Sequence, residues 1–125
     1  VDVLGKVGGF DLAGLAGICL GGAYFHIPIV LDGFISAAAA LAAVKICPNV
    51  REYLLASHTS KEPGMQSILE ELGLTASLHC NMCLGEGTGA VAFLPVLELA
   101  LEVYQKMGTF EDHQIENYKE LGGEN

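Results

Sequence analysis

The sequence predicts an α/β fold with three layers, in which helices flank a Rossmann-like parallel sheet. Short apolar segments at 28–33 and 54–56 are typical of buried strands, and stretches with helical periodicity lie beside them. The first segment is apolar on both faces, as a central parallel strand is. Strands that alternate with helices indicate a parallel sheet covered by helices.

The first predicted helix follows a turn at Gly8 and Gly9. Apolar residues recur at helical spacing from Phe10 to Cys19. Glycines lower helix stability, so those inside this helix are expected to allow close packing against a neighbour. They are Gly14, Gly17 and Gly21.

The uncharged run over 12–31 is long enough to cross a bilayer. However, Gly21, Gly22, His26 and Pro28 interrupt it, and no aromatic or basic residues flank it as membrane anchors. A buried helix followed by a buried strand is therefore favoured over a membrane span.

The remaining elements are expected in the following order along the chain. A helix over 34–46 ends near Pro48, and a turn or short helix follows over 49–54. A polar loop over 57–64 leads into a helix over 63–72 that stops at Gly73, and a further strand lies within 74–84. A glycine turn over 85–89 precedes a long helix over 90–107, in which Pro95 makes a kink or marks the first turn. Residues 109–125 are acidic and polar and predict a tail or an exposed helix, so the domain is expected to comprise 1–108.

Composition excludes several classes of protein. The chain of 125 residues carries a formal charge of −9, and its six basic residues do not cluster, which argues against binding nucleic acid or an anionic membrane. Hydrophobic residues make up 51%, which predicts a large buried fraction. Four cysteines without a visible secretory signal favour free thiols in the cytoplasm. Because the first residue is Val1, the chain is expected to be processed or cut from something longer.

Three loops are expected to meet at one edge of the sheet. Ligands of open α/β sheets bind beyond the carboxyl ends of the strands. Asp32 and Gly33 end the first strand, 57–60 follow the second, and 85–89 lie before the last helix. These loops are the candidate site.

Glu86 is the sharpest candidate for chemistry. It lies among three glycines that allow the backbone to approach a ligand, just before a helix N-terminus. A partly desolvated Glu in such a turn has a raised pKa and can act as a general base. A plain glycine turn with a solvated Glu is the equally weighted alternative.

The other polar candidates have simpler alternatives. Asp32 could bind ribose hydroxyls or could cap the helix that starts at Phe34. Ser60 could bind phosphate at a helix N-terminus, while Thr59 and Glu62 have the spacing of a capping box. Cys80 and Cys83 form a lone C-x-x-C beside His79, and no matching ligand pair for zinc follows.

Taken together, several segments match one family in order and spacing. They are VGGFDLA at 7–13, PIVLDGFIS at 28–36, Ser57-His58 with Ser60, EPG at 62–64, LGEGTGA at 84–90 and MGTFE at 107–111. Over nearly the whole chain, to about Glu111, the sequence resembles the nicotinate-nucleotide–dimethylbenzimidazole phosphoribosyltransferase family, and specifically its C-terminal catalytic portion.

The resemblance implies a reaction and a set of roles. Phosphoribose would move from nicotinate mononucleotide to 5,6-dimethylbenzimidazole, giving α-ribazole 5′-phosphate and nicotinate for the nucleotide loop of cobalamin, with no metal and no cofactor. Glu86 would be the general base, and Leu84 and Gly85 would line the pocket for the azole base. Asp32 and Gly33 would lie near the ribose or nicotinate, and Ser60 near the phosphate.

The chain also departs from the family pattern. The family's earlier glycine-rich phosphate loop lies upstream of Val1, and Cys83 stands where arginine is usual before LGEG. The resemblance implies a homodimer, or pairing with a chain that supplies the N-terminal half. The alternative is a non-catalytic module that binds a nucleotide or azole and has lost turnover.

Overall fold

The computed structural model describes residues 1–108 and Asp112, in two compact units. The first is Val1–Pro95 and the second is Val96–Asn125. Apart from Asp112, the predicted acidic tail lies outside the described residues. The expected division at residue 108 stays a prediction.

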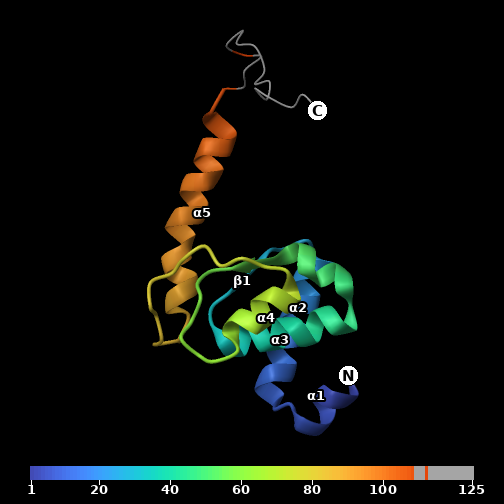
Figure 1. The fold of residues 1–125 in the computed structure, drawn as a ribbon. Helices are drawn as coiled ribbons and strands as arrows, with labels where there is room; N and C mark the ends of the chain where they lie inside the picture. Colours follow the sequence, from blue (N-terminus) through green and yellow to red (C-terminus); the bar gives the residue numbers. More distant parts are fainter. Residues whose placement is uncertain (109–111, 113–125) are drawn as a thin grey trace, which may run out of the picture. The chain divides into compact units, whose positions relative to one another are not determined.

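The first unit contains most of the helices and both strands (Figure 1). In chain order the elements are α1 (Asp2–Val7), α2 (Phe10–Tyr24), β1 (Ile29–Leu31), α3 (Phe34–Ile46), the 3₁₀ helix η1 (Pro48–Tyr53), β2 (Leu54–Ala56), α4 (Met65–Leu72) and the first turns of α5 (Thr88–Lys106). The sequence analysis does not predict the short helix α1, because six residues are too few for a helical pattern to stand out.

The two strands form a parallel pair, which confirms the mixed α/β class. Ile29 pairs with Leu54 and Leu31 with Ala56, and α3 with η1 makes the crossover between them. The prediction of a strand within 74–84 is wrong. That segment makes only an isolated bridge between His58 and Leu78, because its polar residues leave it without a continuous apolar face.

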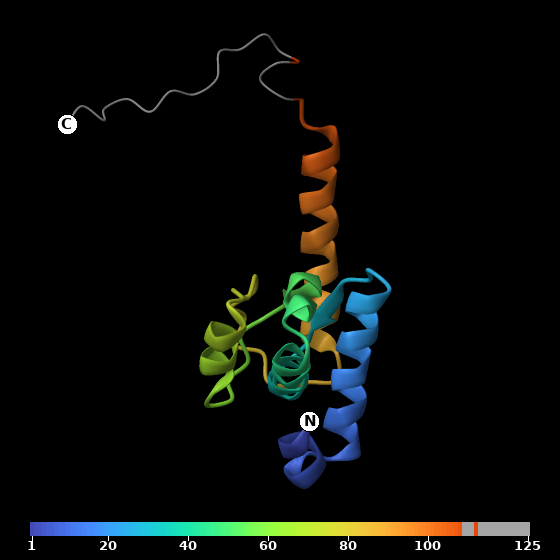
Figure 2. The ribbon, with the colours of Figure 1, turned by 90° about the vertical axis from the view of Figure 1, so that its right-hand side faces the viewer.

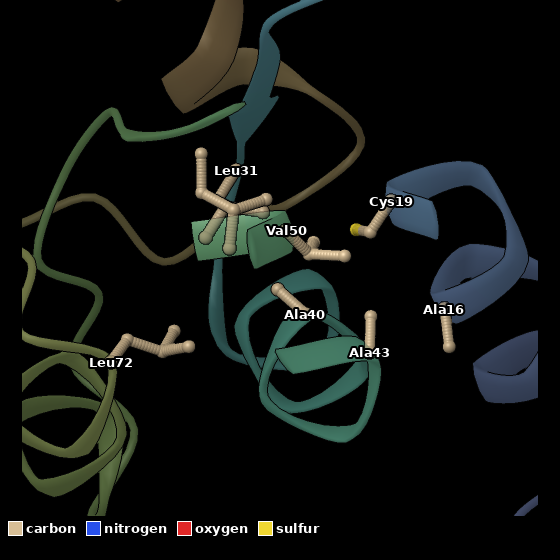
Figure 3. Close-up of a cluster of buried hydrophobic side chains, with 8 residues drawn as sticks. Ala16, Cys19, Leu31, Ala40, Ala43, Val50 and Leu72 are labelled. Atoms are coloured by element: carbon tan, nitrogen blue, oxygen red, sulfur yellow. The ribbon is translucent and has the colours of Figure 1, made fainter. Parts of the chain in front are cut away.

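Helix α3 lies at the centre of the first unit, between α2 and α4 (Figure 2). Its buried face consists of Ala37, Ala39, Ala40 and Ala43, whose small side chains let both neighbours approach. The main core joins Ala40 and Ala43 of this face to Cys19 of α2, Leu31 of β1 and Leu72 of α4 (Figure 3), whereas Ala37 belongs to a second cluster. Burial in this core raises the pKa of the Cys19 thiol.

Helix α2 is buried on one face only, so the prediction of a buried helix holds for that face alone. The prediction that Gly14, Gly17 and Gly21 pack closely is wrong within the described residues, since no atom lies within 4 Å of a Cβ added at any of them. The close contact is made at Gly22, where an added Cβ would lie 2.6 Å from Ile29 Cγ1. Helix α2 needs this glycine in order to pack against β1.

Helix α4 starts two residues later than predicted and is fixed at both ends by left-handed glycines. Gly64 (φ 99°) precedes its first residue, and Gly73 (φ 64°) ends it. Thr59 and Glu62 therefore do not cap it, and their capping-box prediction is wrong. Arg51 closes the other end, where its guanidinium donates to the carbonyl oxygens of Leu72 and Gly73, both at 2.7 Å.

The second unit is described over residues 96–106, which continue α5, and over three further residues. Pro95 thus lies inside a helix that begins at Thr88 and does not mark its first turn. An ion pair joins Glu102 to Lys106, one helical turn apart. Among the described helices, none combines the length and apolarity that a membrane span requires.

The predicted large buried fraction is wrong for the first unit. Several large apolar side chains are exposed there, among them Phe10, Tyr24, Phe25 and Leu84. Many of the hydrophobic residues therefore lie on the surface of the first unit. Exposed apolar side chains of this kind are typical of interaction surfaces.

Candidate functional site

The three predicted loops converge on one cavity of about 260 Å³ in the first unit. Five of the six predicted site residues line it: Asp32, Gly33, Ser60, Gly85 and Glu86. Leu84 does not, and its side chain is exposed. The first turn of α3 and the side chains of His58, Glu62 and Cys83 complete much of the wall.

Asp32 holds the glycine loop through its carboxylate. Oδ1 accepts from the backbone N–H groups of Gly89 (2.8 Å) and Ala90 (3.1 Å), and Oδ2 accepts from Gly87 N–H (3.1 Å). These donors are among the N–H groups at the start of α5 that have no partner inside the helix. A carboxylate at this end also interacts favourably with the helix dipole. The predicted capping of α3 by Asp32 is wrong, because this side chain caps α5 instead.

Helix α3 is capped by Gly33 and Ser36. Ser36 Oγ accepts from Gly33 N–H (3.1 Å) and donates to Gly33 O (2.8 Å). Its first turn lines the cavity, whereas α4 begins five residues after Ser60. Of α3 and α4, it is therefore α3 whose first turn lines the cavity, whereas the loop pattern predicts the start of α4.

Glu86 is held in an unusual backbone conformation. Gly85 (φ 76°), Glu86 (φ 55°) and Gly87 (φ 80°) are consecutive left-handed residues, and Glu86 is one of three described non-glycine residues with positive φ. Such a conformation costs a non-glycine residue about 1 kcal/mol and is common at functional sites. The Glu86 side chain is exposed, so its predicted desolvation is not found within the described residues.

Ser57 and His58 lie buried at the end of β2. Ser57 Oγ is 2.6 Å from Leu31 O and 3.1 Å from Asp32 O, which ties the ends of the two strands together. His58 Nδ1 is 3.1 Å from the same hydroxyl. The sequence motif contains His58 but does not predict it as a site residue, because nothing in the sequence places its ring against Gly89.

Ser60 faces the cavity with an unpaired hydroxyl. Its Oγ is buried and has no hydrogen-bond partner in the described part of the chain. The pKa of the exposed Glu62 carboxyl is lowered, and the nearby Ser60 hydroxyl is the main cause. The two groups are close together but do not have the geometry of a hydrogen bond. A buried, unpaired hydroxyl at a cavity wall is available to a ligand.

The cysteines of the C-x-x-C segment are free and exposed, and Cys83 lines the cavity. The described residues contain no group of three side chains able to hold a metal ion.

Comparison with known proteins places the chain in a family. A family model described as phosphoribosyltransferase, DBI_PRT, matches residues 1–115. The chain belongs to this phosphoribosyltransferase family. Two similar relatives, both named nicotinate-nucleotide–dimethylbenzimidazole phosphoribosyltransferase, come from Clostridium acetobutylicum (55% identical) and Ruminiclostridium cellulolyticum (51% identical). In each, the match covers 97% of this chain but only 34% of the relative, so the chain spans about a third of their length.

A solved member of the family has the same fold over this region. The crystal structure of the enzyme of that name from Thermus thermophilus is 43% identical, with a TM-score of 0.84. The alignment covers 93% of this chain and 35% of that one.

Proposed function

We propose that this chain supplies the general base of a phosphoribosyltransferase that moves phosphoribose from nicotinate mononucleotide to 5,6-dimethylbenzimidazole. Membership of the family and the names of its relatives support the reaction. The products would be α-ribazole 5′-phosphate and nicotinate, used to assemble the nucleotide loop of cobalamin.

The observation that carries the proposal is the setting of Glu86. It is the one non-glycine residue in a left-handed turn at the cavity wall, and Asp32 holds the backbone on its C-terminal side. Because several backbone N–H groups of this loop donate to the Asp32 carboxylate, the loop holds Glu86 in place without a bound ligand. Precise placement of a base is the main requirement for general-base catalysis.

The reaction balances with Glu86 as the only protein group that moves a proton. Glu86 removes the N–H proton of the azole, and the other ring nitrogen attacks the anomeric carbon of the ribose. The bond from that carbon to the pyridinium nitrogen breaks, and its electron pair neutralises the pyridinium ring, so nicotinate leaves. Attack on the face opposite the leaving group inverts the anomeric carbon. A carboxylate also stabilises the positive charge that develops on the azole.

The remaining predicted roles fit around this base. We assign Asp32 to positioning of the Glu86 loop, because its carboxylate oxygens already accept three backbone bonds. Gly33 borders the ribose or nicotinate, and Ser60 offers its unpaired hydroxyl to the phosphate. Leu84 and Gly85 contribute to the azole pocket. Because Leu84 is exposed, a segment from outside this chain must cover it to close that pocket.

The wider assembly is also part of the proposal. The two parallel strands would be the end of a three-layer, Rossmann-like sheet completed by the rest of the family's length. A homodimer, or pairing with a chain that supplies this length, would cover the exposed apolar side chains. Four free cysteines support a cytoplasmic location, and the charge of −9 disfavours nucleic acid. No metal or cofactor takes part in the proposed steps.

The test is release of nicotinate from nicotinate mononucleotide in the presence of dimethylbenzimidazole. It compares this chain alone, this chain completed with the segments that its longer relatives have in addition, and the Glu86→Gln variant of each. We expect the completed protein to transfer phosphoribose and Glu86→Gln to lower kcat by roughly 10²–10⁴-fold. Glu62→Gln, at another carboxylate of the cavity wall, is the matched control and should lower it far less.

Absence of transfer in the completed wild-type protein would contradict the proposal. Binding of the nucleotide or azole without turnover would instead favour the non-catalytic binding module.

A further inference from the structure

His58 is a buried histidine beside the candidate site that the proposed reaction does not use. Only 3% of the residue is exposed. Its backbone is fixed on both sides, because Leu78 N–H donates to Ser57 O (2.9 Å) and Thr59 N–H donates to Leu78 O (3.0 Å). The ring is therefore attached to a rigid part of the chain.

The hydrogen bonds of Ser57 determine which nitrogen of the ring carries the proton. A serine hydroxyl has one proton, and the carbonyl oxygens of Leu31 and Asp32 can only accept. At 2.6 Å from Leu31 O, Ser57 Oγ must donate there. It can then only accept from His58, so Nδ1 carries a hydrogen and Nε2 of the neutral ring carries the lone pair.

The ring lies tightly against Gly89 and in looser contact with Gly33. A Cβ added at Gly89 would lie 1.9 Å from His58 Nδ1 and 2.2 Å from Cε1, so the first turn of α5 leaves space for the ring only because residue 89 is glycine. A Cβ added at Gly33 would lie 4.0 Å from Cε1, in ordinary contact. The ring is thus enclosed by the ends of both strands and by α5.

The His58 ring lines an acidic cavity. Nε2 makes no hydrogen bond within the described residues, and the ring lines the cavity. The other titratable side chains of the cavity wall are Asp32 after β1, Glu62 in the loop before α4, and Cys83 and Glu86 before α5. None of these can carry a positive charge, and no lysine or arginine in the described part of the chain lines the cavity. Among the described lining residues, His58 alone can carry one.

We propose that His58 binds an oxyanion of the nucleotide donor through Nε2 and takes up a proton when it does so. This inference rests on the proposed function, because it takes nicotinate mononucleotide as the ligand. A neutral Nε2 presents a lone pair that repels an oxyanion, whereas a protonated Nε2 donates a charge-assisted hydrogen bond. The phosphate and the nicotinate carboxylate of the donor share this chemistry.

The test follows nucleotide binding and the His58 ring nitrogens by NMR between pH 6 and pH 8, in the chain alone and with the rest of the family's length. The free protein should show the tautomer with hydrogen on Nδ1. Binding of nicotinate mononucleotide should protonate Nε2, and over the pH range in which it does so the affinity should fall by up to about tenfold for each unit that the pH rises, as expected for one linked proton. Inorganic phosphate and nicotinate, titrated separately, identify the oxyanion by which of them protonates the ring.

His58→Gln keeps a hydrogen-bond donor but does not titrate, so binding to this variant should no longer weaken as the pH rises. His79→Gln, at an exposed histidine, is the matched control and should keep it. If His58→Gln fails to fold, the wild-type NMR titration still decides the question.

A neutral ring in the bound state, pH-independent binding, or no binding in either form overturns the inference. Transfer with a pH-independent KM for the nucleotide would overturn this inference and leave the proposed function standing. Proton-linked binding without any transfer would support this inference and contradict the proposed function.

Discussion

At the scale of single residues, Asp32 connects the end of β1 to the loop that carries Glu86. Asp32→Asn keeps the shape of the side chain but removes its charge and replaces one acceptor oxygen with an amide. We expect the free energy of unfolding to fall by about 1–2 kcal/mol, since charge-assisted bonds to the backbone are lost at a helix N-terminus. We also expect kcat of the completed protein to fall while KM for the nucleotide changes little.

Urea unfolding and steady-state kinetics measure both effects. Asp11→Asn is the control, because Asp11 is also an aspartate in the first turn of a helix but lies away from the cavity. An Asp32→Asn variant with wild-type kcat would contradict the positioning role.

The left-handed backbone of Glu86, the base that we propose, should lower the stability of the fold. Glu86→Gly should raise the free energy of unfolding by up to about 1 kcal/mol, because glycine adopts φ near 55° without strain. The same change should abolish transfer. Gly87→Ala tests the argument in the opposite direction: it adds a Cβ that meets no atom within 4 Å, so only the backbone (φ 80°) opposes it, and stability should fall. Equal thermal stability of all three proteins would show that the loop is unstrained.

At the scale of elements, the C-terminus of α4 depends on a side chain from η1. Arg51→Met keeps the length of the side chain but removes both bonds to the carbonyl oxygens of Leu72 and Gly73. We expect a loss of about 1–2 kcal/mol, because two helix-end carbonyls lose their partners. Lys45→Met is the control, since it breaks only the exposed pair with Glu71 that lowers the pKa of that carboxyl. Urea denaturation in which the two variants are equally stable would contradict this account.

The elements also show which features the sequence could predict. The bounds of α3 follow from an alanine-rich run between Gly33 and Pro48, and β1 and β2 follow from short apolar runs. Local pattern was enough there, because propensity and packing agree. The sequence does not give the start of α4, because Gly64 adopts a left-handed conformation that no local pattern specifies. Nor does it give the contacts of Asp32 and His58 with Gly89, because Gly89 lies more than thirty residues from each of them in the chain.

At the scale of the whole molecule, the loops of the site could be predicted, but the exposure of Glu86 could not. The rule that ligands bind beyond the carboxyl ends of parallel strands placed three distant loops together, and the cavity confirms this placement. Burial depends on everything that surrounds a side chain, and this chain spans only 34% of the relatives it matches. Patterns within the chain carry no information on what covers it.

The exposed apolar side chains of the first unit make the last prediction. Phe10 is fully exposed and Tyr24 is 77% exposed, at the two ends of α2. Since large exposed apolar patches mark interaction surfaces, we expect the chain alone to bind the dye ANS and to self-associate in sedimentation velocity. Addition of the rest of the family's length should reduce dye binding and raise the midpoint of thermal unfolding, because a partner that binds only the folded state stabilises it. Phe10→Ser with Tyr24→Ser should weaken self-association, whereas Glu52→Ser, at another exposed site, should not. A chain that is monomeric and binds no dye would mean that these side chains need no partner.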